Sequence, residues 1–218
     1  PWVHKYPHFA WPKPRADFLG EAIRWWNRWL RGEQNGAENL PQVRAYILDA
    51  IRPAPRRDFD PGFWIAKESW TSPEKHHFHV DADGQLARGL GRGTGGQVFL
   101  RSPLDTGTSS GEYFTLKPDA EMAVDQRGDD AGSLVFETEP LTEELDYLGM
   151  PSVKLTVSCD AEIANLCARI VDVHPDGTAY RVAFGVLNLA HRNSNARPEP
   201  LVPGEKTEIT LVLDACGY

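Results

Sequence analysis

Apolar residues recur along residues 18–31 with the spacing of an α-helix. They form one broad stripe at positions 18, 19, 22, 23, 25, 26, 29 and 30, the i, i+3, i+4, i+7 pattern of an amphipathic helix. Asp17 can cap the first turn, and Gly32 can end the helix in a left-handed conformation. Because three of the stripe residues are tryptophans, we expect the stripe to pack against a protein core rather than to bind a ligand.

After this helix the hydrophobic period changes to 2, which is typical of β-strands. The clearest alternation is at Val153, Leu155 and Val157, where polar residues stand between and favour a strand with one face in water. Further strands are expected at residues 43–48, 77–80, 97–100, 113–116, 134–137, 166–173, 179–189 and 208–213, with Gly- and Pro-containing turns between them. Many short strands with little helix predict a mainly β fold, a β-sandwich or jelly roll.

Composition and charge narrow the classes of function. The 218 residues are 41% hydrophobic and 25% charged, which excludes a disordered chain and a disulfide-dense mini-protein. The net charge of −8 argues against nucleic acid as the main partner, and no apolar run approaches the ~18 residues that cross a membrane. Ten basic and five acidic residues fall in the first 57 positions, against thirteen and twenty-six in the remainder. This asymmetry indicates two regions, and the start at a proline within a tryptophan-rich segment indicates a piece of a longer protein.

Short segments along the chain resemble one family of hydrolases. The first four residues, Pro-Trp-Val-His, are similar to the G-P-W-x-H segment of the CocE/NonD hydrolases. That family includes cocaine-esterase-like acyl esterases, α-amino-acid ester hydrolases and X-Pro dipeptidyl-peptidases. Similar segments follow in the family's order at residues 18–32, 35–36, 41–46, 134–141, 171–177 and 185–192.

The resemblance implies a fold and a division into domains. In the family, an α/β-hydrolase domain with a Ser–Asp–His triad precedes a C-terminal jelly-roll domain. Residues 1–40 are therefore expected to be the end of an α/β-hydrolase domain, with its last helix, and residues 41–218 a galactose-binding-like jelly-roll β-sandwich. Relatives continue with further strands beyond the position of Tyr218, so the sandwich is expected to be truncated.

The same resemblance implies that His4 is the triad base, which takes the proton of a serine hydroxyl and returns it to the leaving group. In α/β-hydrolases the triad runs Ser, Asp or Glu, then His, so the nucleophile and the acid are expected upstream. Ser109 stands at the centre of Gly-Thr-Ser-Ser-Gly, but no strand–turn–helix pattern surrounds it. The intact parent is expected to cleave acyl esters or X-Pro peptide bonds, and this chain alone to be inactive. His8 lies outside the motif and is expected to be dispensable.

A second class of function stays open, a non-catalytic β-sandwich binding or assembly module in which His4 does nothing chemical. The helix directly after this histidine favours the hydrolase, because a free-standing sandwich does not need it. The expected partner is a small-molecule ester or peptide substrate, and a homo-oligomer is compatible with the sequence. The three cysteines, an odd number, are expected to be buried free thiols in a reduced cytoplasm.

Two clusters of ligand-type side chains have weak metal-binding patterns. His77 and His79 share one face of a strand, but no suitable third ligand apart from Asp81 follows, so a solvated strand face is favoured. Asp125, Asp129 and Asp130 loosely match a calcium loop that lacks its bidentate glutamate, and a solvated loop pairing with Arg127 is favoured. We therefore expect neither a metal nor a cofactor.

Overall fold

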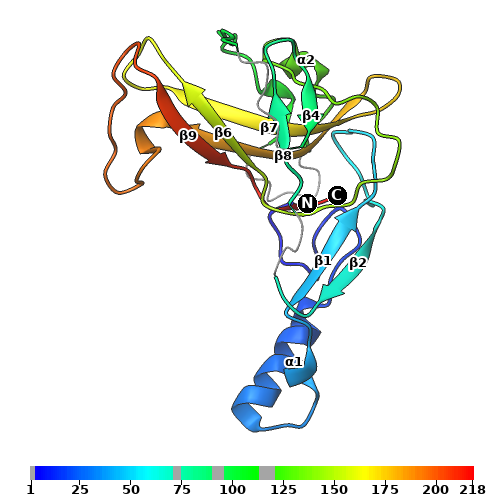
Figure 1. Ribbon diagram of the computed structural model, residues 1–218. Helices are drawn as coiled ribbons and strands as arrows, with labels where there is room; N and C mark the ends of the chain where they lie inside the picture. Colours follow the sequence, from blue (N-terminus) through cyan, green and yellow to red (C-terminus); the bar gives the residue numbers. More distant parts are fainter. Residues whose placement is uncertain (1–2, 71–74, 90–95, 113–120) are drawn as a thin grey trace.

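A computed structural model describes residues 3–70, 75–89, 96–112 and 121–218 of the protein (Figure 1). The helical elements are α1 (Phe18–Arg31), α2 (Arg127–Asp130) and the 3-10 turns η1 (Ala37–Asn39), η2 (Thr108–Ser110) and η3 (Leu189–His191). The strands are β1 (Val43–Leu48), β2 (Gly62–Lys67), β3 (Phe78–Val80), β4 (Leu86–Arg88), β5 (Leu148–Gly149), β6 (Ser152–Val157), β7 (Asn165–Val173), β8 (Ala179–Asn188), β9 (Thr207–Val212) and β10 (Cys216–Gly217).

The core lies between two antiparallel strand pairs, β6–β9 and β7–β8. Residues of β6 and β9 alternate between the two faces, so their apolar side chains point to one side and their polar side chains to water. Two buried clusters fill the space between the pairs, one around Ala183, Leu211 and Leu213, the other around Leu189, Leu201 and Ile209. The chain is thus mainly β with a sandwich core, as the alternation predicted.

A second unit extends away from this sandwich and consists of the β1–β2 hairpin and α1 (Figure 1). The loop between the hairpin strands returns to the sandwich. There the Ile51 carbonyl lies 3.0 Å from Nε2 of His174, and the Arg57 guanidinium lies over the ring of Tyr180 at 5.7 Å. These contacts attach the hairpin unit to the end of β7 and the start of β8.

The helix begins and ends where the sequence predicted. Asp17 accepts a hydrogen bond from the Gly20 N–H at 3.0 Å, and Gly32 closes the C-terminus in the left-handed region with φ 71°. Most expected strands are also confirmed, with bounds shifted by at most one residue in β1, β3, β6, β7, β8 and β9.

Other expectations for the strands were wrong. Residues 97–100 form no strand, and in residues 134–137 Glu137 makes an isolated bridge to Gln85. Both segments are largely exposed, and their apolar residues are consecutive, so they lack the alternation that buries one face of a strand. Residues 113–116 lie outside the described residues. The described strands join in pairs, and the jelly-roll strand order stays a prediction.

Candidate functional site

His4 is exposed at the start of an irregular segment, residues 3–16, which precedes α1 and which we call the His4 loop. Residues 1 and 2 of the Pro-Trp-x-His pattern lie outside the described residues. Next to His4, Val3 is buried, and its N–H donates to the Trp11 carbonyl at 2.7 Å. A further bond from the Ala16 N–H to the Pro7 carbonyl, at 3.0 Å, folds the loop onto itself. The loop is therefore compact although it has no regular secondary structure.

The far end of the His4 loop is paired with the connection between β1 and β2. The N–H of Lys13 donates to the Asp58 carbonyl and the N–H of Asp60 donates to the Lys13 carbonyl, both at 2.8 Å. Ala10 and Pro12 are buried beside this pairing. The backbone that carries His4 is thus fixed to residues 58–60, which belong to the part of the chain expected to be the sandwich domain.

An aromatic cluster covers the middle of the His4 loop and joins it to α1. The His8 ring lies edge-on to Phe9, with 4.5 Å between centroids, and stacks at 6.1 Å on Phe18, the first residue of α1. Tyr6 stacks on Phe18 at 5.7 Å. Tyr6, Phe9 and Phe18 nevertheless remain exposed on their outer side. The loop therefore presents an apolar surface next to an exposed histidine.

The polar side of α1 is the side that contacts the rest of the chain. Arg24 donates to the carbonyls of Asn35 and Gly36 at 3.1 and 3.0 Å. Arg28 pairs with Glu38 at 2.8 Å, and Glu21 pairs with Arg44 of β1 at 2.9 Å. Positions 21, 24 and 28 follow the three- and four-residue spacing of one helix face. The polar contacts therefore hold the helix with its apolar stripe turned away.

The apolar stripe of α1 is exposed, so the described residues do not contain the protein core that it is expected to pack against. No residue of α1 is buried, and Trp25, Trp26 and Trp29 keep 45, 56 and 51% of their surface exposed. Leu19, Ile23 and Leu30 extend the same exposed surface. A contiguous apolar patch of this kind on a folded protein marks an interaction surface.

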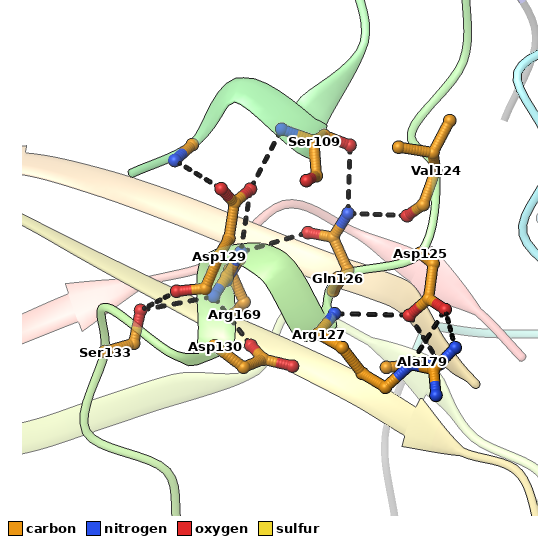
Figure 2. A network of polar contacts seen from close by, with 11 residues as sticks. Ser109, Val124, Asp125, Gln126, Arg127, Asp129, Asp130, Ser133, Arg169 and Ala179 are labelled. Carbon is orange, nitrogen blue, oxygen red and sulfur yellow. Dashed lines mark hydrogen bonds and ion pairs between the residues drawn. The ribbon is translucent and has the colours of Figure 1, made fainter. Parts of the chain in front are cut away.

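The acidic cluster is part of a buried network, so the expected solvated loop was wrong (Figure 2). Asp129 is 3% exposed and accepts hydrogen bonds from the N–H groups of Gly107 and Ser109, at 2.8 and 3.1 Å. Gln126 is fully buried and donates to the carbonyls of Ser109 and Val124, at 3.0 and 2.7 Å. These bonds connect η2 with α2.

Arg169 of β7 completes this network. Its guanidinium donates to Asp130 at 2.7 Å and to Gln126 at 3.1 Å, and lies 3.4 Å from Asp129 (Figure 2). Burial raises the pKa of Asp130, and the nearby Arg169 charge opposes this effect. The expected pairing of Asp125 with Arg127 is confirmed at the exposed edge. The network joins the segment around η2 and α2 to the sandwich, and its polar atoms are engaged with one another.

The structure also shows the surroundings of the remaining candidate residues. Ser109 lies in a 3-10 turn, and the side chains of Asp129 and Gln126 bind the backbone of this turn. The turn therefore differs from the strand-to-helix elbow that carries a nucleophilic serine. His79 approaches the Gly89 carbonyl at 3.4 Å, and the described residues contain no group of three metal-ligating side chains. The cysteines are free, but Cys167 is exposed, contrary to expectation. No described helix is long and apolar enough to span a membrane.

Comparison with known proteins identifies the larger part of the chain. Residues 35–218 match the X-Pro dipeptidyl-peptidase C-terminal non-catalytic domain. Cocaine esterase from Rhodococcus sp. (strain MB1 Bresler) is 25% identical over 198 residues, which cover 85% of this chain and 33% of the esterase. The chain thus spans about a third of the length of this curated relative. His4 and α1 lie before the matched range.

Three solved structures with a similar fold are of enzymes. An aminopeptidase from the marine sediment archaeon Thaumarchaeota archaeon has a TM-score of 0.63 at 22% identity, covering 89% of this chain and 33% of the aminopeptidase. An α-amino acid ester hydrolase has a TM-score of 0.56 at 20% identity, covering 71% and 29%. A CocE/NonD family hydrolase from Staphylococcus aureus has a TM-score of 0.55 at 14% identity, covering 91% and 35%. At these identities the likeness shows the fold.

Proposed function

Because the chain belongs to the family of X-Pro dipeptidyl-peptidase C-terminal non-catalytic domains, we propose that it is the C-terminal part of a longer serine hydrolase. In this proposal the parent protein cleaves acyl esters or X-Pro peptide bonds through a Ser–Asp–His triad. The serine and the aspartate belong to an α/β-hydrolase domain that precedes this chain, and His4 is the base. The sandwich itself takes no part in the chemistry.

The orientation of α1 is the observation that carries this proposal. Its polar face is held by Arg24, Arg28 and Glu21, while its tryptophan stripe faces away from the chain. A helix that covers the sheet of an α/β-hydrolase needs an apolar face in this place, directly after the catalytic histidine. Each large apolar side chain contributes about 1.5–3 kcal/mol when fully buried, so the stripe supplies a substantial part of a domain interface.

The position of His4 fits the role of a base. It is exposed and lies two residues before Tyr6, whose ring stacks on Phe18 at the start of α1. A domain that covers the α1 stripe would therefore extend toward the segment that carries His4. Such a histidine accepts the serine proton as the hydroxyl attacks the substrate carbonyl and then protonates the leaving group. A carboxylate from the covering domain would fix its tautomer.

The catalytic role is tested with a serine-directed fluorophosphonate probe and with ester or X-Pro substrates. We expect the parent protein to be labelled and the 218-residue chain to remain unlabelled. In the parent, His4→Ala should lower turnover about 10⁴-fold or more, as loss of one triad member does in related systems. His77→Ala, at another exposed histidine, should keep it. Stoichiometric labelling of the chain alone, or an active His4→Ala protein that remains folded, would overturn the assignment.

The interface is tested by a pair of charge substitutions on α1. Ile23 belongs to the outward stripe and is 61% exposed, whereas Arg31 is an exposed residue outside the stripe. In the parent protein, Ile23→Glu should lower the melting temperature and the yield of folded enzyme, because it places a carboxylate in an apolar interface. Arg31→Glu should leave both nearly unchanged. Equal tolerance of the two substitutions would contradict burial of the stripe.

The alternative is a binding or assembly module in which the stripe binds a different partner. It predicts that no serine elbow and no later acid precede this chain in its gene, and that His4→Ala changes no reaction.

For the hydrolase we propose a cytoplasmic location, because the chain has few cysteines and those present are free thiols. Fractionation of cells that express the tagged parent protein tests this placement.

A further inference from the structure

Asp60 connects three parts of the chain. Its carboxylate accepts two hydrogen bonds from Arg57, at 2.7 Å from Nε and 3.2 Å from the terminal nitrogen. Its carbonyl accepts from the Tyr46 hydroxyl of β1 at 3.1 Å, and its N–H donates to the Lys13 carbonyl of the His4 loop at 2.8 Å. Arg57 in turn lies over Tyr180 of β8. One residue thus links β1, the sandwich and the loop that carries His4.

The Arg57–Asp60 pair is built to be rigid. Its side chains are 10% and 4% exposed, and the two parallel bonds fix the relative orientation of guanidinium and carboxylate. Arg57 also donates to the Ala54 carbonyl at 3.2 Å, so the guanidinium is held from a second direction. A buried pair with this geometry resists rotation of the Asp60 backbone, which is the backbone that Lys13 pairs with.

A short path connects this pair with His4. Lys13 is bonded to both Asp58 and Asp60, Pro12 beside it is buried, and the Trp11 carbonyl accepts the N–H of Val3, the neighbour of His4. Every link on this path is a backbone hydrogen bond or a covalent bond. The backbone next to His4 is therefore connected to residues 58–60, which lie within the matched C-terminal domain.

We propose that Arg57 and Asp60 are positioning residues for His4, through which the non-catalytic sandwich domain holds the catalytic base in place. This inference rests on the proposed function of His4 as the triad base. We call the Arg57–Asp60 pair the clamp. In this proposal it touches neither substrate nor nucleophile, and it acts by limiting the motion of the His4 loop. A misplacement of a catalytic group by about 1 Å can cost 10²-fold in rate, so a loosened loop should lower turnover.

The chain offers a matched control in the buried pair of Arg169 and Asp129. Their side chains are 12% and 3% exposed, close to the values for Arg57 and Asp60. This second pair lies between β7 and α2 and is not on the path to His4. Both pairs should contribute similarly to stability, whereas the first pair alone should affect the reaction.

The experiment compares Asp60→Asn with Asp129→Asn in the parent protein, at a temperature where both variants are folded. We expect Asp60→Asn to lower kcat about ten-fold with little change in KM, and Asp129→Asn to keep wild-type kcat. Under native conditions, trypsin should cut the loop after Lys5 or Arg15 faster in Asp60→Asn. If Asp60→Asn does not fold, Tyr46→Phe removes one bond to the Asp60 carbonyl and should give a smaller effect in the same direction.

Three outcomes would overturn the clamp. These are an unchanged kcat in Asp60→Asn, an equal loss in Asp129→Asn, and a loss that is fully explained by the unfolded fraction. A failure of the proposed function is distinguishable, because it shows as full activity in His4→Ala, whatever the Asp60 variants do. Loss of activity in His4→Ala together with a normal Asp60→Asn enzyme would reject the clamp alone.

Discussion

Replacing Asp129 by alanine tests the polar network that joins η2 and α2 to the sandwich. The carboxylate accepts two backbone N–H groups, from Gly107 and Ser109, and lies 3.4 Å from the Arg169 guanidinium. Alanine leaves both donors unpaired in a buried place and removes one of the two anions that face Arg169. Removing one partner of a buried pair costs about 3–5 kcal/mol. Because Asp130 still pairs with Arg169, we expect the lower end, about 3 kcal/mol.

The assay is urea denaturation of the chain followed by far-ultraviolet circular dichroism. A loss of about 3 kcal/mol is a large share of the 5–15 kcal/mol that stabilises ordinary domains, so the midpoint should shift clearly. Asp105→Ala is the control, since Asp105 is an exposed carboxylate in the same loop, and its loss should cost less than about 0.5 kcal/mol. A cost below about 1 kcal/mol for Asp129→Ala would refute the claim that this carboxylate holds the segment in place.

Three further predictions concern the tyrosines near the C-terminal strand and the second acid of the network. The Tyr147 hydroxyl is buried without a hydrogen bond of ordinary geometry in the described chain, and its one polar neighbour there is the weakly bonding Cys216 thiol, so Tyr147→Phe should leave stability unchanged or raise it by up to about 1 kcal/mol. Tyr218→Phe loses its 2.7 Å bond to Asp172 and should cost about 1 kcal/mol or more, and both changes are measured by urea denaturation. Burial raises the pKa of both tyrosines above the ordinary value of about 10, so above that pH the unfolded chain releases protons that the folded chain keeps. The free energy of unfolding should therefore fall as the pH rises above about 10, and it should fall less in Tyr147→Phe. Burial also raises the pKa of Asp130, which means that its ionisation is disfavoured in the folded chain, so Asp130→Asn should cost less than Asp129→Ala in the same denaturation assay.

The sequence predicted those elements whose signals are local. The stripe and caps of α1 lie within sixteen consecutive residues, and the alternation in β6 through Val153, Leu155 and Val157 is complete within one strand. The sequence pattern did not predict β2, because its apolar residues follow one another instead of alternating and most of its residues are exposed. The burial of Asp129 could not be predicted either, because its guanidinium partner comes forty residues later in β7.

The candidate site shows the same limit. A short motif indicates His4, but the proposed role of Asp60 and Arg57 depends on contacts between segments that are far apart in the sequence. The apolar stripe of α1 was correctly located, but its direction relative to the rest of the chain could not be predicted, because periodicity shows that a helix has two faces without showing which one meets the rest of the chain. The ion pairs of Glu21 and Arg28 decide this, and they form with residues outside the helix.

The outward stripe of α1 also affects how the isolated chain behaves in solution. A molecule that displays several tryptophans and leucines on one helix is amphiphilic, and such molecules associate through their apolar sides as concentration rises. Dimers or larger particles of the purified chain would then be held together by Trp26 and its neighbours, and dilution or mild detergent should disperse them. In the proposed parent protein a preceding domain covers this helix, so an oligomer of the chain alone would not measure how that protein assembles.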